Sequence, residues 1–281
     1  MRKMLLPVLA ALVMTACKKE MVSDLSLRQA EIASSAAAKG AEKIAIWHVD
    51  ATTNTWKQMT INANAWPDHQ AHGDIWKVGQ EYKGGKIGYI LQAGDPGYDA
   101  KLPHGLIAAA EDLLNPYYLD PDPQPFFTWA PDVNGIGGFF GVGEAARGTA
   151  IGTGLSNTNA IVQYLPDVVN TINTTFPWLD LKLDRYAAVA CRKEFNGYND
   201  WFLPSRDELQ KILQNRMSIG GFPDANGPFR ISYWSSTEHS WDGDASRAYL
   251  CYYDSGTAPG QVVTYNDRSI YEYRARPVRY F

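Results

Sequence analysis

Residues 197–209, GYNDWFLPSRDEL, constrain the fold of this chain more than any other segment. The pair Asn196-Gly197 predicts a turn, and the aromatic-rich run after it predicts an extended segment. Ser205 and Glu208 form a capping box, in which the serine hydroxyl accepts from the third helical amide and the glutamate reaches back to the capping amide. The apolar residues that follow recur at helical spacing: Leu209, Ile212 and Leu213. Capping and turn chemistry thus explain the polar residues of this segment, and it contains no nucleophile.

The composition is typical of a domain with short strands and many turns. Aromatic residues make up 12% of the chain, and it contains 24 Gly and 16 Pro. Glycine and proline interrupt regular elements, whereas aromatic residues favour strands. Four large side chains in aromatic or alternating segments are expected in the core: Trp201, Leu203, Trp234 and Val278.

Helices are expected at 157–172 and 186–195. The first carries one apolar stripe, and we expect it to break at Pro166 because proline removes a backbone donor. The Pro- and Gly-rich stretch 115–148 is expected to form a long surface insertion. Strands are expected at 86–92, 233–236, 248–253, 261–265 and 274–280.

The N-terminus predicts export and lipidation. Arg2 and Lys3 form a basic start, the apolar run 4–14 is too short to span a bilayer, and small residues precede Cys17. This order resembles the signal of bacterial lipoproteins, in which the cysteine is lipidated and becomes the first mature residue. Several acyl chains on one cysteine give a stable membrane anchor. We therefore expect a lipid-anchored protein of the bacterial cell envelope, at the outer membrane or cell surface; the alternative is an ordinary secretory signal with an incidental cysteine.

The sequence divides into four parts. A signal peptide at 1–17 is followed by a small, polar tether at 18–40, an N-terminal hairpin extension at 41–75 and the main domain at 76–281. Within the extension, 43–50 and 56–61 predict two strands, which could extend the edge of the main sheet.

Two cysteines follow Cys17. Cys191 lies in an expected helix and Cys251 in an expected strand. Export to an oxidising compartment makes a disulfide between them one interpretation. The other is two separately buried thiols that act as small hydrophobic groups.

Charge and histidine spacing argue against two kinds of partner. The formal net charge is −4 and no basic run occurs outside the signal, so we expect no nucleic-acid binding. A helix or turn could bring the histidines His69 and His72 close to the carboxylate of Asp74. The sequence shows no further ligand at a fixed position that would complete a metal site. We therefore expect a solvated loop there, with no metal site and no cofactor. The glycine-rich run 135–143 lacks the lysine of a phosphate-binding loop.

Several motifs, in the same order, resemble the DUF1566 family, also described as the Lcl C-terminal domain. They are 78–91, 104–109, 152–158, GYNDWFLPSRDEL at 197–209, YWSSTE at 233–238 and RARPVRYF at 274–281. The resemblance implies an α+β, C-type-lectin-like fold with short strands, two or three helices and long loops. It also implies a distant relation to formylglycine-generating enzymes, which use a close pair of cysteines.

We expect a non-enzymatic, surface-anchored lipoprotein whose domain binds a glycan or protein ligand, as in adhesion. Domains of this class bind through long loops and nearby strands near the C-terminal half, which correspond here to 238–247 and 254–269. The candidate ligand-binding residues there are Trp241, Asp242, Asp244, Asn266 and Arg268. The two acids lack EF-hand spacing, so an acidic turn is preferred to a calcium site. The alternatives are a formylglycine-generating type of enzyme and a structural subunit of an envelope assembly.

Overall fold

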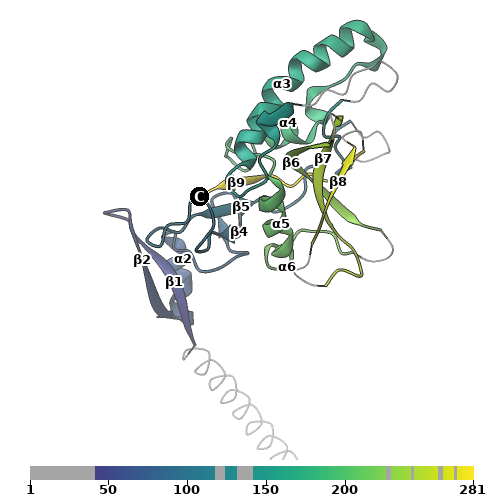
Figure 1. The fold of residues 1–281 in the computed structure, drawn as a ribbon. Helices are drawn as coiled ribbons and strands as arrows, with labels where there is room; N and C mark the ends of the chain where they lie inside the picture. Colours follow the sequence, from purple (N-terminus) through teal and green to yellow (C-terminus); the bar gives the residue numbers. More distant parts are fainter. Residues whose placement is uncertain are drawn as a thin grey trace, which may run out of the picture. The chain divides into compact units, whose positions relative to one another are not determined.

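The structure is a computed structural model that describes residues 42–117, 124–131, 142–225, 229–241, 244–258, 262–268 and 271–281. The chain divides into two compact units, Met1–Trp76 and Lys77–Phe281. Both contain helices and strands, so the chain belongs to the α+β class (Figure 1). Cys17 and the expected tether 18–40 lie outside the described residues.

The first unit is a β-hairpin followed by a short helix. Its described elements are β1 (Lys43–Asp50), β2 (Thr55–Asn62), η1 (Ala63–Ala65) and α2 (Trp66–Ala71). The two strands pair antiparallel over their whole length, which confirms the hairpin predicted from the sequence. Apolar side chains of both strands and two tryptophans form a small core: Ile44, Ile46, Ile61, Trp66 and Trp76.

The hairpin forms a two-stranded sheet of its own, so the expectation that it extends the main sheet is wrong. Trp47 of β1 instead exchanges two backbone hydrogen bonds with Ile75, at 2.8 and 3.0 Å. Part of the outer edge of β1 is therefore occupied from within the same unit, which leaves less edge for another strand to join.

The second unit contains two antiparallel sheets. One has the strand order β3-β4-β5-β9 and the other the order β6-β7-β8. The strands are β3 (Glu81–Tyr82), β4 (Gly85–Ile90), β5 (Gly105–Ala108), β6 (Ile231–Trp241), β7 (Asp244–Tyr253), β8 (Val263–Arg268) and β9 (Val278–Tyr280). Because β9 pairs with β5, the C-terminal strand completes a sheet that the first strands of the unit begin.

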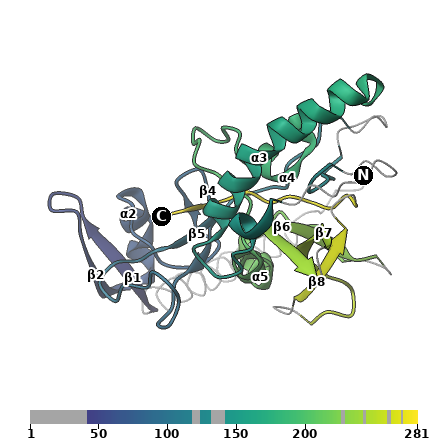
Figure 2. The same cartoon turned by 45° about the horizontal axis from the view of Figure 1, so that its top comes forward.

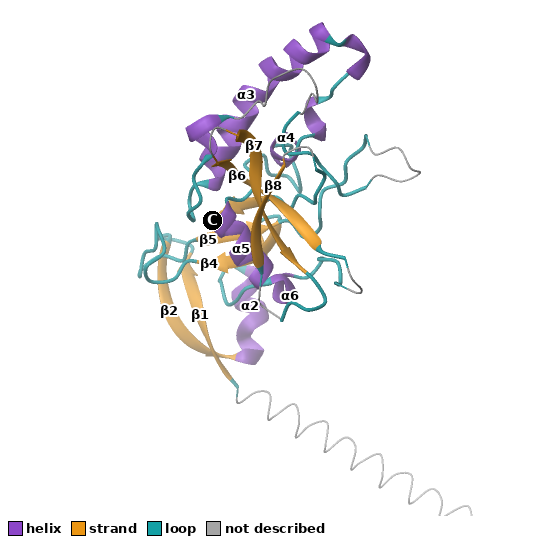
Figure 3. Cartoon of the chain, turned by 45° about the vertical axis from the view of Figure 1, so that its right-hand side comes forward, coloured by secondary structure: helices purple, strands orange, loops and turns teal. Residues whose placement is uncertain are grey.

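Short helical elements connect these sheets, together with one long helix. They are η2 (Gly143–Ala146), α3 (Gly154–Thr175), η3 (Pro177–Leu179), η4 (Leu183–Arg185), α4 (Ala187–Cys191), α5 (Arg206–Gln214) and α6 (Arg216–Ile219). α5 contacts β4 of one sheet and β6 and β7 of the other, and Figure 3 shows it between them. Its first turn has the predicted capping box, with both reciprocal hydrogen bonds between Ser205 and Glu208.

α3 continues through Pro166, so the expected break does not occur. Its buried stripe is continuous on both sides of the proline: Ile161, Leu165, Val168, Val169 and Ile172. Burying each large aliphatic side chain contributes about 1.5–3 kcal/mol. Together they outweigh the roughly 3 kcal/mol that a proline costs inside a helix. Figure 2 shows α3 beside α4, which it contacts.

The helix expected at 186–195 is shorter, because α4 ends at Cys191. Phe195 instead exchanges backbone hydrogen bonds with Tyr198, at 2.9 and 3.1 Å. Asn196 between them has a φ of 51°, in the left-handed region that asparagine tolerates in turns. The turn predicted at Asn196-Gly197 is therefore confirmed, and it terminates the preceding segment.

The segment 124–131, within the stretch 115–148 that was expected to be a surface insertion, is partly buried, whereas 118–123 and 132–141 lie outside the described residues. Phe127 and Trp129, in this segment, are 0% and 1% exposed. The Trp129 indole donates to the Ser235 carbonyl at 2.8 Å, and the Trp234 indole donates to the Phe127 carbonyl at 2.9 Å. These bonds join the stretch to β6, so it supplies part of the main core. All four side chains predicted in the core are fully buried: Trp201, Leu203, Trp234 and Val278.

Candidate functional site

Four of the five expected ligand-binding residues lie on strands. Trp241 and Asp244 face each other at the tip of the β6–β7 hairpin. Asn266 and Arg268 belong to β8, where they pair with Tyr249 and Arg247. Strand pairing extends further than the sequence suggests because β7 bonds to a neighbour on each side. Asp242 and the side chains of the other four lie outside the described residues.

The charged residues of the family-like motifs join segments of the second unit to each other. Arg279 makes two 2.7 Å hydrogen bonds with the carboxylate of Asp200. Arg276 is fully buried, and its Nε lies 2.7 Å from Asp112, which also accepts from Arg274. Asp200 therefore pairs with an arginine instead of serving mainly in a turn. These motifs maintain the scaffold, and they do not converge on a reacting centre.

Cys191 and Cys251 are free thiols, so the disulfide considered from the sequence is not formed. They belong to two different core clusters and are 1% and 0% exposed. Burial raises the pKa of the Cys251 thiol to about 12 and raises the pKa of the Cys191 thiol further. Because the thiolate is the reactive form of cysteine, neither residue is a nucleophile at neutral pH.

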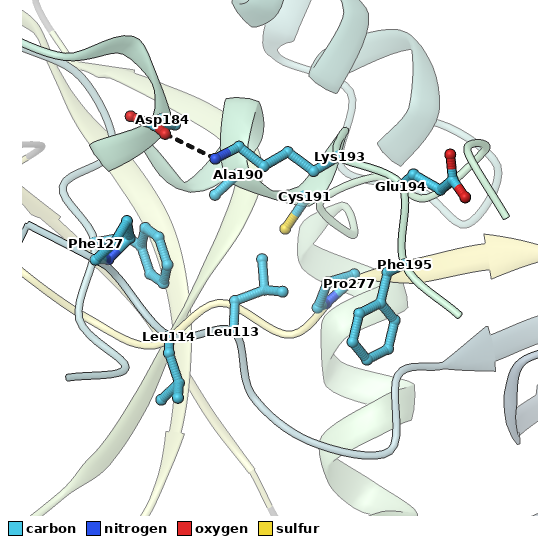
Figure 4. Close-up of a pocket in the computed structure, with 11 residues that line it drawn as sticks. Leu113, Leu114, Phe127, Asp184, Ala190, Cys191, Lys193, Glu194, Phe195 and Pro277 are labelled. Carbon is cyan, nitrogen blue, oxygen red and sulfur yellow. Dashed lines mark hydrogen bonds and ion pairs between the residues drawn. The ribbon is translucent and has the colours of Figure 1, made fainter. Parts of the chain in front are cut away.

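A small pocket of about 160 Å³ lies beside Cys191 (Figure 4). The cysteine sulfur points toward Leu113, and Phe127 lines the same hollow. At its rim Lys193 forms an ion pair with Asp184 at 2.7 Å. The pocket is apolar inside and charged outside, but its volume is below the roughly 300–1,000 Å³ of most ligand sites.

A larger groove of about 430 Å³ lies where α6 meets the end of β7. Its floor contains Arg216, whose guanidinium lies 4.3 Å from the centre of the Tyr253 ring. Met217, which is 75% exposed, and Phe222 add apolar surface, and Asp254 adds a carboxylate. Apolar and aromatic walls with a few polar groups are typical of small-molecule sites. The lining residues of the turn after β7 belong to the predicted ligand region 254–269.

A third pocket, of about 220 Å³, opens near the C-terminus between His104, Tyr280 and Phe281. Behind it lies the fully buried Glu208, which accepts from the Tyr280 hydroxyl at 2.7 Å and from the Gly152 amide at 2.8 Å. Burial raises the pKa of the Glu208 carboxyl, although its hydrogen bonds oppose the rise. The donors around Glu208 come from the scaffold, so we assign this carboxyl to structure.

One set of described residues has the composition of a metal site: His48, His69 and Asp74 of the first unit. Asp74 is fully buried, so the expectation of a solvated loop at 69–74 is wrong. The histidine spacing at 69 and 72 does not point to His48. The alternation of β1 indicates that His48 faces inward, because it is on the same face of the strand as the buried Ile44 and Ile46.

Comparison with protein-family models finds no match, and a search of curated proteins finds no similar sequence. The resemblance to the DUF1566 family therefore rests on the quoted motifs alone. Within the described part of the chain, no helix combines the length and the apolar character needed to cross a membrane.

Proposed function

We propose that the protein is a lipid-anchored lipoprotein of the bacterial cell envelope that binds a ligand through its second unit and catalyses no reaction. In this proposal the unit is a C-type-lectin-like domain of the DUF1566 type, and its ligand is a glycan or a protein. The groove lined by Arg216, Met217, Phe222 and the turn after β7 is the observation that carries the proposal. It combines aromatic and apolar surface with a cation and a carboxylate, which suits a ligand with polar edges.

The state of the cysteines favours binding over catalysis of the formylglycine-generating type. That chemistry needs a reactive cysteine pair, whereas Cys191 and Cys251 are buried in different clusters with raised pKa values. The burial of both thiols therefore supports the proposed binding function over the enzymatic alternative.

A glycan array probed with the purified full chain tests the binding proposal. Met217→Glu places a charge in the groove at an exposed position, and we expect it to weaken binding by at least about tenfold with an unchanged melting temperature. Trp178→Ala is the matched control, because Trp178 is 76% exposed outside the groove. If Trp241→Ala weakens binding and Met217→Glu does not, the ligand binds at the β6–β7 tip instead. Absence of any bound glycan or protein ligand would contradict the proposal.

The anchor is tested separately by Cys17→Ser. We expect the variant to lose its acyl chains and to leave the detergent phase, because one cysteine carries the whole anchor. A variant that still partitions with membranes and carries acyl chains would contradict the lipoprotein proposal.

A further inference from the structure

A cluster of two histidines and an aspartate lies in the first unit, outside every pocket described above. His48 comes from β1, His69 from α2 and Asp74 from the turn after α2. The Nδ1 atoms of His48 and His69 lie 2.9 and 2.6 Å from the same oxygen, Oδ2 of Asp74. The ligand atoms of the three residues all lie within 4.8 Å of one another.

His72, at the C-terminal end of α2, is adjacent to the same cluster. Its ring stacks on that of His69, with centroids 5.4 Å apart, and is 5.9 Å from the ring of His48. Residues three apart on a helix share a face, which explains how α2 presents both rings together. His72 is exposed, so its ring can turn toward the cluster without disturbing the core.

The backbone holds Asp74 in a fixed orientation. Its Oδ1 accepts from the Val49 amide at 2.9 Å, and its own amide donates to the His69 carbonyl at 3.1 Å. Gly73 has a φ of 95°, which allows the sharp turn that brings the carboxylate back toward α2. Oδ1 is thus bonded to β1, while Oδ2 faces the two imidazoles.

These donors match a particular class of cation. Two or three imidazole nitrogens with one carboxylate oxygen favour Zn²⁺ and similar transition metals, whereas Ca²⁺ and Mg²⁺ prefer oxygen ligands alone. Tetrahedral Zn²⁺ has bonds of about 2.0–2.1 Å, which places its ligand atoms roughly 3.3 Å apart. Oδ2 of Asp74 is closer than that to the Nδ1 atoms of His48 and His69, by about 0.4 and 0.7 Å, so the imidazoles must move away from the carboxylate by that much to admit the ion. Val49 would continue to orient the carboxylate, as outer partners of metal ligands do.

We propose that His48, His69 and Asp74, with His72 as the fourth ligand, bind a divalent transition metal ion, Zn²⁺ fitting best. The site involves no residue of the groove, so it is independent of the proposed ligand binding. Its direct readout is metal affinity, which can be measured without a ligand of the second unit.

The test is a Zn²⁺ titration of the full chain, purified without a polyhistidine tag, against a chromophoric chelator. We expect His48→Ala, His69→Ala and Asp74→Asn each to weaken Zn²⁺ binding by at least about tenfold. His104→Gln is the matched control, since His104 lies outside the cluster, and it should bind Zn²⁺ as the wild type does. Wild-type affinity equal to that of the His69→Ala variant would overturn the proposal.

Two further measurements decide the outcome if the buried variants fail to fold. His72→Ala alters an exposed side chain, so we expect a folded protein with weaker Zn²⁺ binding. Co²⁺ added to the wild type should give the intense visible absorption of a four-coordinate site, and Zn²⁺ should displace it. Unchanged affinity in His72→Ala removes His72 from the ligand set, and absence of the Co²⁺ spectrum overturns the site. Binding of Ca²⁺ in preference to Zn²⁺ would also overturn it.

Discussion

Asp74 in the first unit and Glu208 in the second are both fully buried carboxylates, but their surroundings differ. Two backbone amides and a tyrosine hydroxyl donate to Glu208, at 2.7–2.8 Å. The Val49 amide donates to Oδ1 of Asp74, whose Oδ2 faces two imidazoles. A carboxylate surrounded by scaffold donors stabilises the fold, whereas one that shares an oxygen with histidines can also bind a metal ion. The partners therefore indicate function better than burial does.

The pKa shifts of the two acids differ in the same way. Burial raises the pKa of Glu208, and its hydrogen bonds do not overcome that effect. Burial also acts to raise the pKa of Asp74, but the Val49 amide and the two histidines outweigh it and lower the pKa. The charged form of Asp74 is thus favoured, which is the form that a cation needs.

The largest expected loss of stability is that of a core tryptophan in the second unit. Trp201→Ala removes a fully buried indole that also donates to the Phe195 carbonyl at 2.8 Å. We expect it to lower the free energy of unfolding by about 3–5 kcal/mol, the range for a large aromatic lost from a core. Urea denaturation measures the change, and a loss below about 1 kcal/mol would contradict the assignment of Trp201 to the core.

Glu208→Ala is expected to rank next. It removes the reciprocal half of the α5 capping box and leaves the Ser205 and Gly152 amides and the Tyr280 hydroxyl without their acceptor. The expected loss is about 2–4 kcal/mol, since each unsatisfied buried donor costs about 1–3 kcal/mol. Urea denaturation of Glu208→Ala and Asp74→Ala side by side tests whether the scaffold-bonded acid contributes more. A larger loss in Asp74→Ala would reverse the comparison.

The pH dependence sharpens the structural role of Glu208. A raised pKa in the folded state means that the folded protein binds this proton more tightly than the unfolded chain does. Its contribution is complete below the ordinary value of 4.5 and is lost as the pH rises through the folded pKa. As the pH rises from 4.5 through the folded-state pKa, we therefore expect wild-type stability to fall relative to Glu208→Gln. Parallel stability–pH curves for the two proteins would contradict this.

Asp74→Asn is expected to have a smaller effect without metal. Asparagine keeps an acceptor for the Val49 amide, so we expect a loss of about 1–2 kcal/mol in chelator-treated protein. With Zn²⁺ at about 100 times its Kd, the wild type should gain about 2.7 kcal/mol that the variant lacks. Thermal unfolding without Zn²⁺ measures the loss of stability in the variant, and unfolding with Zn²⁺ measures the stabilisation by the ion. Equal stabilisation of the two proteins by Zn²⁺ would place the ion elsewhere.

The smallest effect is expected at an exposed tryptophan. Trp178 is 76% exposed, so Trp178→Ala should change the free energy of unfolding by less than about 0.5 kcal/mol. A melting curve that differs clearly from the wild type would show that this side chain packs against another part of the protein.

Local signals in the sequence predicted several elements correctly. The capping box at Ser205 and Glu208, the turn at Asn196-Gly197 and the hairpin of β1 and β2 depend on neighbouring residues, whose interactions are written in short spacings. The burial of Trp201 followed from the aromatic character of its extended segment. The α+β class was implied by the resemblance to the DUF1566 family, and the mixture of helices and strands in the structure agrees with it.

Interactions between distant segments were not accessible in this way. The continuity of α3 through Pro166 depends on a core that covers both halves of the helix. The burial of the Pro- and Gly-rich stretch depends on indole hydrogen bonds between Trp129, Trp234 and their partners, which are more than 100 residues apart. Composition predicted a surface insertion there, and it could not indicate that Phe127 and Trp129 are buried.

The sequence by itself thus determined where turns, caps and apolar stripes occur, because those preferences act within a few residues. Only the tertiary structure decided which polar residues lie next to each other and can act together. Spacing brought His69 and His72 together but left His48 apart, and the pairing of Trp47 with Ile75 places His48 against Asp74. The sequence left open whether Cys191 and Cys251 form a disulfide or remain two single thiols. The structure places them in different hydrophobic core clusters. Contacts between distant residues form only when the burial of many side chains offsets the entropy of closing the chain, and no local pattern records that balance.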